Sequence, residues 1–146
     1  MPVLDRAFVD VWAPRAHALL RIVTGFLFLQ HGSAKLLGFP GGKETVPIVS
    51  LYGLAGVLEL VGGLLIVIGL FTRPVAFVLA GEMAVAYFMA HVPQGHLLSP
   101  TLNQGEPAVL FCFVFLFLAV AGAGPWSVDA ARRGAGVART GTPVAR

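Results

Sequence analysis

Four long apolar stretches dominate the sequence and leave few folds open to it. They cover residues 17–38, 52–70, 74–91 and 107–123. Each is roughly 17–22 residues long, enough for a helix to cross a hydrocarbon core about 30 Å thick. Lipid excludes open strands, because their backbone groups would stay unpaired. The sequence therefore predicts an all-α polytopic membrane protein, a four-transmembrane-helix bundle.

Composition excludes several other classes of protein. Hydrophobic residues make up 57% and charged residues 12% of the 146 residues, and a soluble chain of this length could not bury so much apolar surface. The net charge of +3 is small and the arginines are scattered, which excludes a nucleic-acid-binding domain. The single cysteine, Cys112, excludes a CxxC thiol centre, a zinc thiolate cluster and an iron–sulfur cluster.

Basic residues predict the orientation of the spans. The N-terminal segment, the turn at Arg73 and the C-terminal tail share one side of the membrane. They hold most of the basic residues: Arg6, Arg15, Arg73, Arg132, Arg133, Arg139 and Arg146. The two longer loops carry only Lys35 and Lys43. The positive-inside rule then places both termini in the cytoplasm of a bacterial cell and the longer loops outside the inner membrane.

The two ends of the chain carry weaker signals. Four apolar residues near the N-terminus share one helical face and predict a short interfacial helix: Leu4, Phe8, Val11 and Trp12. Residues 1–126 form the expected membrane domain. Residues 127–146 are rich in Ala, Gly, Arg and Thr and are expected to be a disordered basic tail.

Polar residues inside the apolar stretches are the candidates for function, because they are costly to insert. Counted at 1.5 Å per residue, His31, Glu59 and Glu82 lie at similar depth on three different helices. We therefore expect a polar pocket in the outer half of the bundle. Its predicted lining residues are Glu59, Glu82, His31 and Gln30, and its predicted rim residues are Lys35, His91, Asn103 and Glu106.

Small residues support an inward orientation for Glu59. Ala55, Glu59 and Gly63 follow i, i+4, i+8 spacing, with Gly56 and Gly62 beside them, so neighbouring helices can approach closely along this stripe. Arg21 differs from the other polar residues. It lies near the cytoplasmic end of the first span, and we expect its side chain to extend to that interface.

Three interpretations of the polar pocket stay open. It serves as a proton relay or ligand site, as intramembrane ionisable residues commonly do. Alternatively, the two glutamates are structural, sharing a proton or pairing with His31 or Lys35. A metal site is the third interpretation. Because no HxxxH or ExxH spacing occurs, no metal ligand is assigned.

Several motifs resemble the DoxX family of small four-helix bacterial and archaeal membrane proteins. They lie between about residues 15 and 126, and the most specific are the block Gly56–Gly63 and the turn Gly69–Arg73. The family is named after a subunit of an archaeal quinol oxidase system, also described as a thiosulfate:quinone oxidoreductase. Some relatives are linked to complexes with superoxide dismutase and a thiol oxidoreductase. The resemblance implies a functional role for Arg21, Lys35, Glu59, Glu82 and Glu106.

The first functional hypothesis is a membrane subunit of a redox complex that holds a quinol headgroup against Glu59, Glu82 and His31. Its expected partners are the lipid bilayer and redox subunits, because the sequence has no nucleotide or flavin motif, no CxxC and no haem pair. It is not expected to be a complete oxidoreductase on its own. The alternatives are a small permease or channel subunit, with further helices supplied by a homo-oligomer, and an assembly or stability factor.

Overall fold

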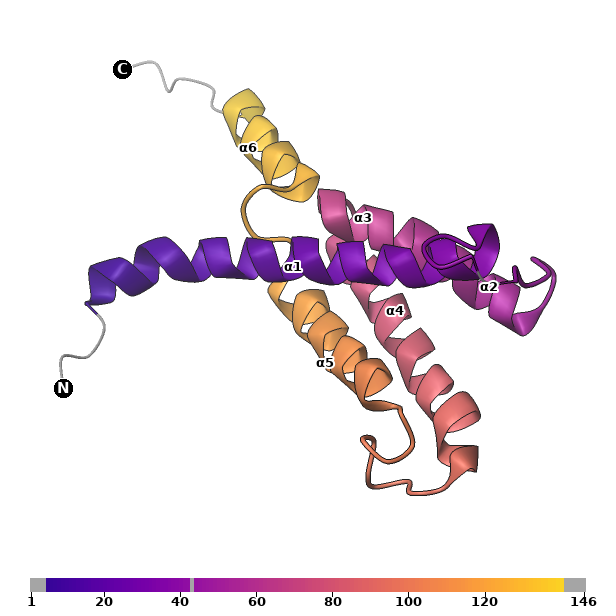
Figure 1. Cartoon of the computed structure of the whole chain (residues 1–146). Coiled ribbons are helices and arrows are strands. Elements are labelled where there is room, and N and C mark those ends of the chain that lie inside the picture. The colour runs from indigo at the N-terminus through magenta and orange to yellow at the C-terminus, as the bar shows by residue number, and fades with distance from the viewer. Residues whose placement is uncertain (1–4, 43, 141–146) are drawn as a thin grey trace, which may run out of the picture.

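The computed structural model describes residues 5–42 and 44–140, with side chains through residue 134, and this part of the chain is helical without strands (Figure 1). The all-α prediction is confirmed. The elements are α1 (Arg6–Leu37), α2 (Leu51–Val57), the π-helix η1 (Leu58–Gly62), α3 (Gly63–Ile68), α4 (Thr72–Ala86), the π-helix η2 (Tyr87–His91), the 3₁₀-helix η3 (Val92–Gln94), α5 (Glu106–Ala121) and α6 (Val128–Thr140).

Helix α1 is longer than the sequence predicts. It joins the expected interfacial helix and the expected first span into one helix from Arg6 to Leu37, with Pro14 inside it. Asp5 begins the helix by accepting a hydrogen bond from the backbone N–H of Ala7 (3.3 Å). The helix continues through Pro14, although proline removes one backbone hydrogen bond there. Leu4, part of the predicted interfacial face, lies outside the described residues. In Figure 1 the N-terminal part of α1 extends beyond the other helices.

Helices α2, η1 and α3 form one continuous rod that packs against α1 through glycines. A Cβ on Gly25 of α1 would lie 2.9 Å from the carbonyl oxygen of Gly63, and a Cβ on Gly63 would lie 2.7 Å from the backbone nitrogen of Leu29. A Cβ on Gly32 would overlap the backbone at Gly56 and Leu60. The two backbones therefore touch along the predicted stripe of small residues.

Helix α4 packs mainly along α5, and this pair diverges from α1 (Figure 1). The buried core between them includes Leu79 and Phe115, and Phe28 of α1 meets Phe115 edge to face at 4.8 Å between ring centroids. Contacts between α1 and α5 are few. The bundle is therefore tight between α1 and the α2–α3 rod and between α4 and α5, while these two pairs contact each other less.

Two helical rods are long and apolar enough to cross a membrane, Leu51–Ile68 with 18 residues and Thr72–Gln94 with 23. Helix α5 is apolar but has only 16 residues, and α1 carries several polar residues in its apolar part. The predicted count of four spans is therefore only partly supported. Large apolar side chains such as Phe77 and Val120 are exposed, which suits contact with lipid rather than water.

The C-terminal segment forms helix α6, where the sequence predicts disorder. The hydroxyl oxygen of Ser127 caps the helix by accepting a hydrogen bond from the N–H of Ala130 (3.2 Å). The Asp129 carboxylate accepts hydrogen bonds from the N–H groups of Phe71 (3.0 Å) and Thr72 (2.9 Å), so α6 caps the start of α4. Alanine-rich sequence and this docking favour the helix. Lys43 and residues 141–146, with Arg146, lie outside the described residues.

Replacing Gly25 by alanine should destabilise the fold, because the added Cβ would lie 2.8 Å from the backbone nitrogen of Val67 and backbone cannot move aside cheaply. We expect a loss of about 1–3 kcal/mol, measured as a lower Tm of the purified protein in detergent. Gly81→Ala is the control, since a Cβ at Gly81 of α4 meets nothing within 4 Å. Equal Tm values for the two variants would contradict the proposed backbone contact.

Replacing Asp129 by asparagine should lower Tm at neutral pH. Partial burial opposes ionisation, but hydrogen bonds from the backbone of Thr72 and Phe71 outweigh it and hold the pKa of the Asp129 carboxyl below its usual range. A lowered pKa contributes stability above the unfolded value of about 3.9 and loses it as the pH falls through the folded value. The Tm difference from wild type should therefore shrink between pH 6 and pH 3. Asp10→Asn is the control, because Asp10 is exposed on α1, and it should leave the Tm at neutral pH close to that of wild type.

Candidate functional site

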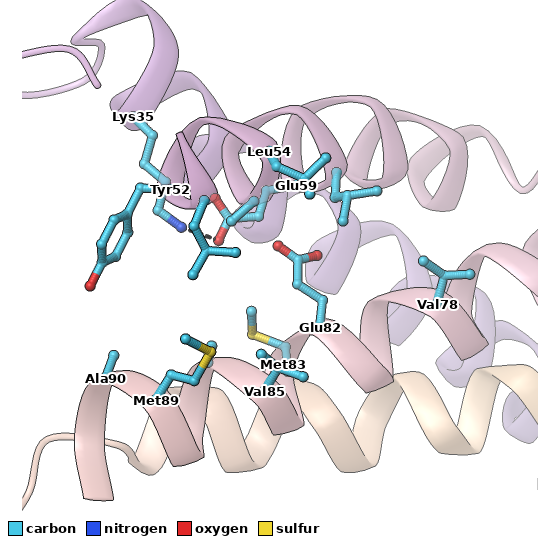
Figure 2. A pocket seen from close by; sticks show the side chains of 14 residues that line it. Lys35, Tyr52, Leu54, Glu59, Val78, Glu82, Met83, Val85, Met89 and Ala90 are labelled. Carbon is cyan, nitrogen blue, oxygen red and sulfur yellow. Dashed lines mark hydrogen bonds and ion pairs between the residues drawn. The ribbon is translucent and has the colours of Figure 1, made fainter. Parts of the chain in front are cut away.

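Three charged side chains from three helices line one cavity of about 420 Å³ between the α2–η1 rod and α4 (Figure 2). Lys35 comes from the last turn of α1, Glu59 from η1 and Glu82 from α4. The volume lies in the range of small-molecule sites, about 300–1,000 Å³. The cavity is therefore large enough for a ligand and has charged groups to bind one.

Lys35 and Glu59 form an ion pair. The Lys35 Nζ donates to Oε1 of Glu59 at 2.5 Å. The Glu59 side chain is 3% exposed and that of Lys35 is 30% exposed, so the lysine extends from the surface toward the buried carboxylate. The other carboxylate oxygen of Glu59, Oε2, is buried and has no hydrogen-bond partner among the described residues. The pair thus neutralises Glu59 but leaves one acceptor free.

Glu82 has no partner within the described part of the chain. Both of its carboxylate oxygens are buried and make no hydrogen bond. Figure 2 shows this carboxylate directed across the cavity toward the helix that carries Glu59. Because Lys35 already binds Glu59, the cavity contains three buried acceptor oxygens without a donor. Such groups are costly in an apolar environment unless they are protonated or a ligand binds them.

Small side chains and a helix irregularity create the space. Ala55 on α2, Ala86 at the end of α4 and Ala90 on η2 line the cavity, where larger residues would fill it. Glu59 lies within the π-helical turn Leu58–Gly62, and such turns occur frequently at functional sites. The remaining lining is largely apolar, with Leu51, Tyr52, Leu54, Leu58, Val78, Met83, Val85 and Met89.

The structure does not bring His31 and Gln30 to this cavity. They line a separate hollow with Phe111, where the exposed His31 ring meets the Phe111 ring edge to face at 5.7 Å. The predicted pocket assumed that all helices stay close in the outer half of the bundle. His31 lies instead beside Phe111 of α5, whereas the cavity lies between the rod and α4.

Among the predicted rim residues, only Lys35 lines the cavity. His91 and Asn103 belong to a cluster that anchors the loop before α5. The His91 Nδ1 lies 3.1 Å from the Asn103 carbonyl oxygen, and the buried Asn103 amide donates to the Tyr87 hydroxyl (3.3 Å). Glu106 is exposed at the start of α5, in a hollow with Thr24 and Leu110. Sequence reasoning missed Tyr87, whose hydroxyl in an apolar stretch was the available signal.

Arg21 is buried and does not extend to the interface, contrary to expectation. Its guanidinium donates to five backbone carbonyl oxygens at the ends of α3 and α5, those of Ile66, Val67, Ala123, Pro125 and Trp126. Helix ends leave carbonyl groups without partners inside the helix, and a guanidinium has five N–H groups to satisfy them. Arg21 therefore organises the end of the bundle remote from the cavity.

No metal centre is indicated in the described ranges 5–42 and 44–140, where no three His, Cys, Asp or Glu side chains are grouped closely enough to hold an ion. In the cavity itself the third charged group is an ammonium, which does not ligate metals while protonated. The arrangement suits hydrogen bonding to an organic ligand better than ion coordination.

A family model described as DoxX matches residues 16–92, which include Arg21, Lys35, Glu59 and Glu82. An uncharacterized protein of Haemophilus influenzae is 44% identical, covering 83% of this chain and 93% of its own. The putative oxidoreductase CatD of Bacillus subtilis is 31% identical, covering 71% and 77%. The inner membrane protein YqjF of Escherichia coli is 29% identical, covering 75% and 85%. No solved structure shows a significant match.

Removing one partner of the ion pair should destabilise the protein more than removing both. Lys35→Met leaves the Glu59 carboxylate buried without a partner, whereas Lys35→Met combined with Glu59→Gln removes the charge as well. We expect a coupling free energy of about 1–3 kcal/mol in a double-mutant cycle, measured by Tm and denaturation in detergent. Additive effects of the two substitutions would show that the contact adds no stability.

Proposed function

The chain belongs to the DoxX family of membrane proteins, and we propose that it is a membrane subunit of a redox complex in the bacterial inner membrane, where it binds a quinone-type ligand. One observation carries the proposal. Three buried carboxylate oxygens that have no hydrogen-bond partner in the described part of the chain face a largely apolar cavity that also contains an ammonium group. A quinol supplies hydroxyl donors for the carboxylates, and a quinone carbonyl can accept from Lys35.

The proposed topology has four membrane-spanning segments, formed by α1, the α2–α3 rod, the α4–η2 helix and α5. Arg73, Arg132 and Arg133 lie near the end of the bundle where α6 caps α4, and the cavity lies toward the opposite end. With basic residues on the cytoplasmic side, the cavity lies in the outer half of the membrane and both termini are cytoplasmic.

The redox chemistry itself belongs to a partner subunit in this proposal. The chain has a single cysteine, Cys112, and no nucleotide- or flavin-binding motif, so its own residues supply binding groups and a proton acceptor. The name of the Bacillus subtilis relative, a putative oxidoreductase, is consistent with this role. Glu82 is the residue placed to accept a proton from a bound quinol hydroxyl, since its carboxylate is not engaged by Lys35.

Replacing Glu82 by glutamine should lower the amount of quinone that co-purifies with the chain without lowering its abundance in membranes. The neutral amide keeps the shape of the side chain but is a weaker acceptor. Purification from native membranes in mild detergent, with mass spectrometry of the organic extract and of the bound proteins, measures both quantities. We expect a reduction of about tenfold or more in bound quinone, because a hydrogen bond to a charged group contributes about 1.5–3 kcal/mol.

Glu44→Gln is the matched control, because Glu44 lies exposed in the loop between α1 and α2. It should change neither bound quinone nor abundance. If Glu82→Gln lowers the abundance of the chain or of its partner proteins as much as it lowers bound quinone, the carboxylate is structural and the assembly-factor hypothesis is favoured. A wild-type protein that purifies alone and without quinone would contradict the redox-subunit proposal.

A further inference from the structure

The cavity has a wall that is also the outer surface of the bundle. Six of its apolar lining residues are more than half exposed: Leu51, Tyr52, Leu54, Val78, Val85 and Met89. They come from the two helical rods that are long and apolar enough to cross a membrane. A space bordered by exposed apolar side chains on two such helices opens toward lipid.

The opposite wall is closed and carries the charges. Gly32 of α1 packs directly on the backbone at Gly56 and Leu60, which leaves no space between α1 and the rod there. Glu59 is 2% exposed, and Figure 2 shows Lys35 and Glu82 directed toward the same part of the cavity. The cavity therefore has a polar inner end and an apolar outer side.

We propose that the ligand enters sideways from the bilayer, between α2 and α4, and that it is a lipid-soluble molecule with a compact hydrogen-bonding head and an apolar tail. The head meets Glu82 and the free oxygen of Glu59, and the tail leaves past Leu54 and Met89. This inference rests on the proposed function and specifies the class of ligand and its route.

The charges of the site disfavour a phospholipid as its specific ligand. Two carboxylates and one ammonium give the inner end a net negative charge when all are ionised, which repels a phosphate group. The exposed apolar side likewise disfavours a water-soluble solute, because such a molecule would lose its hydration without gaining partners along this route. An uncharged head that donates hydrogen bonds fits the polar inner end of the cavity, and an apolar tail fits its outer side.

The test uses the full chain in lipid nanodiscs with decylubiquinol, a benzoquinol that carries a ten-carbon tail, as the probe. Ala55→Phe narrows the cavity from the α2 side and Ala90→Phe narrows it from the α4 side. Each should weaken binding about tenfold or more in an equilibrium binding measurement. Leu64→Phe, at an exposed position of the same rod that does not line the cavity, should bind like wild type. A Tm measurement identifies any variant that fails to fold. If one of the two cavity variants fails to fold, the binding measured for the other tests the proposal.

Photocrosslinking with an azido derivative of the same quinol locates the route. Crosslinks should map to residues 51–58 and 78–90. Tight binding that both cavity variants retain, or crosslinks confined to α5, would overturn lateral access while leaving quinone binding in place. Wild-type nanodiscs in which only phospholipid crosslinks, with no saturable quinol binding, would overturn the assigned ligand class. The redox-subunit proposal is tested separately, by the quinone and the partner proteins that co-purify with the chain from native membranes.

Discussion

The guanidinium of Arg21 binds the carbonyl groups that end two other helices, and the geometry of the bundle depends on this contact. Its partners come from the end of α3 and from the segment after α5, so one side chain joins three helices. Asp129 joins α6 to the start of α4 at the same end of the molecule. Loss of the arginine would leave several carbonyl groups without a donor in an apolar environment, which is costly. The helices are thus fixed together at one end and free to diverge at the other.

The cavity lies toward the other end, between the α2–η1 part of the rod and α4. Near Arg21, five carbonyl groups share one guanidinium. In the cavity, Lys35 binds one of the four carboxylate oxygens of Glu59 and Glu82, and the other three make no hydrogen bond within the described residues. A sequence selected for stability alone would place an apolar residue at Glu82. Local violations of packing rules are expected where a protein binds something. The contrast between Arg21 and Glu82 distinguishes a polar group that supports the fold from one available to a ligand.

Much of the fold follows from the sequence, because apolar length and glycine spacing act locally. The helical rods lie where the apolar stretches lie, and Gly56 and Gly63 contact α1. Counting the helical rise per residue predicts that Glu59 and Glu82 lie at similar depth in the membrane, and both line the cavity. The position of His31 depends on which neighbouring helix packs beside it, here α5 at Phe111, and residue spacing within one helix does not predict that. The burial of Arg21 depends on carbonyl groups far away in sequence, and the helix over residues 128–140 depends on docking against α4.

The π-helical turn at Leu58–Gly62 gives the site an unusual dependence on residue count. Such a turn is an α-helix that accommodates an additional residue. Residues before it are consequently rotated about the helix axis relative to those after it, by about 100° per residue gained or lost. Deleting one residue in this turn would restore a regular helix and change which faces Ala55 and Leu54 present to α4, although every cavity residue could remain in the chain. The residues that line the cavity are therefore not enough to form the site, because the π-helical turn must also rotate them to the correct side of the helix.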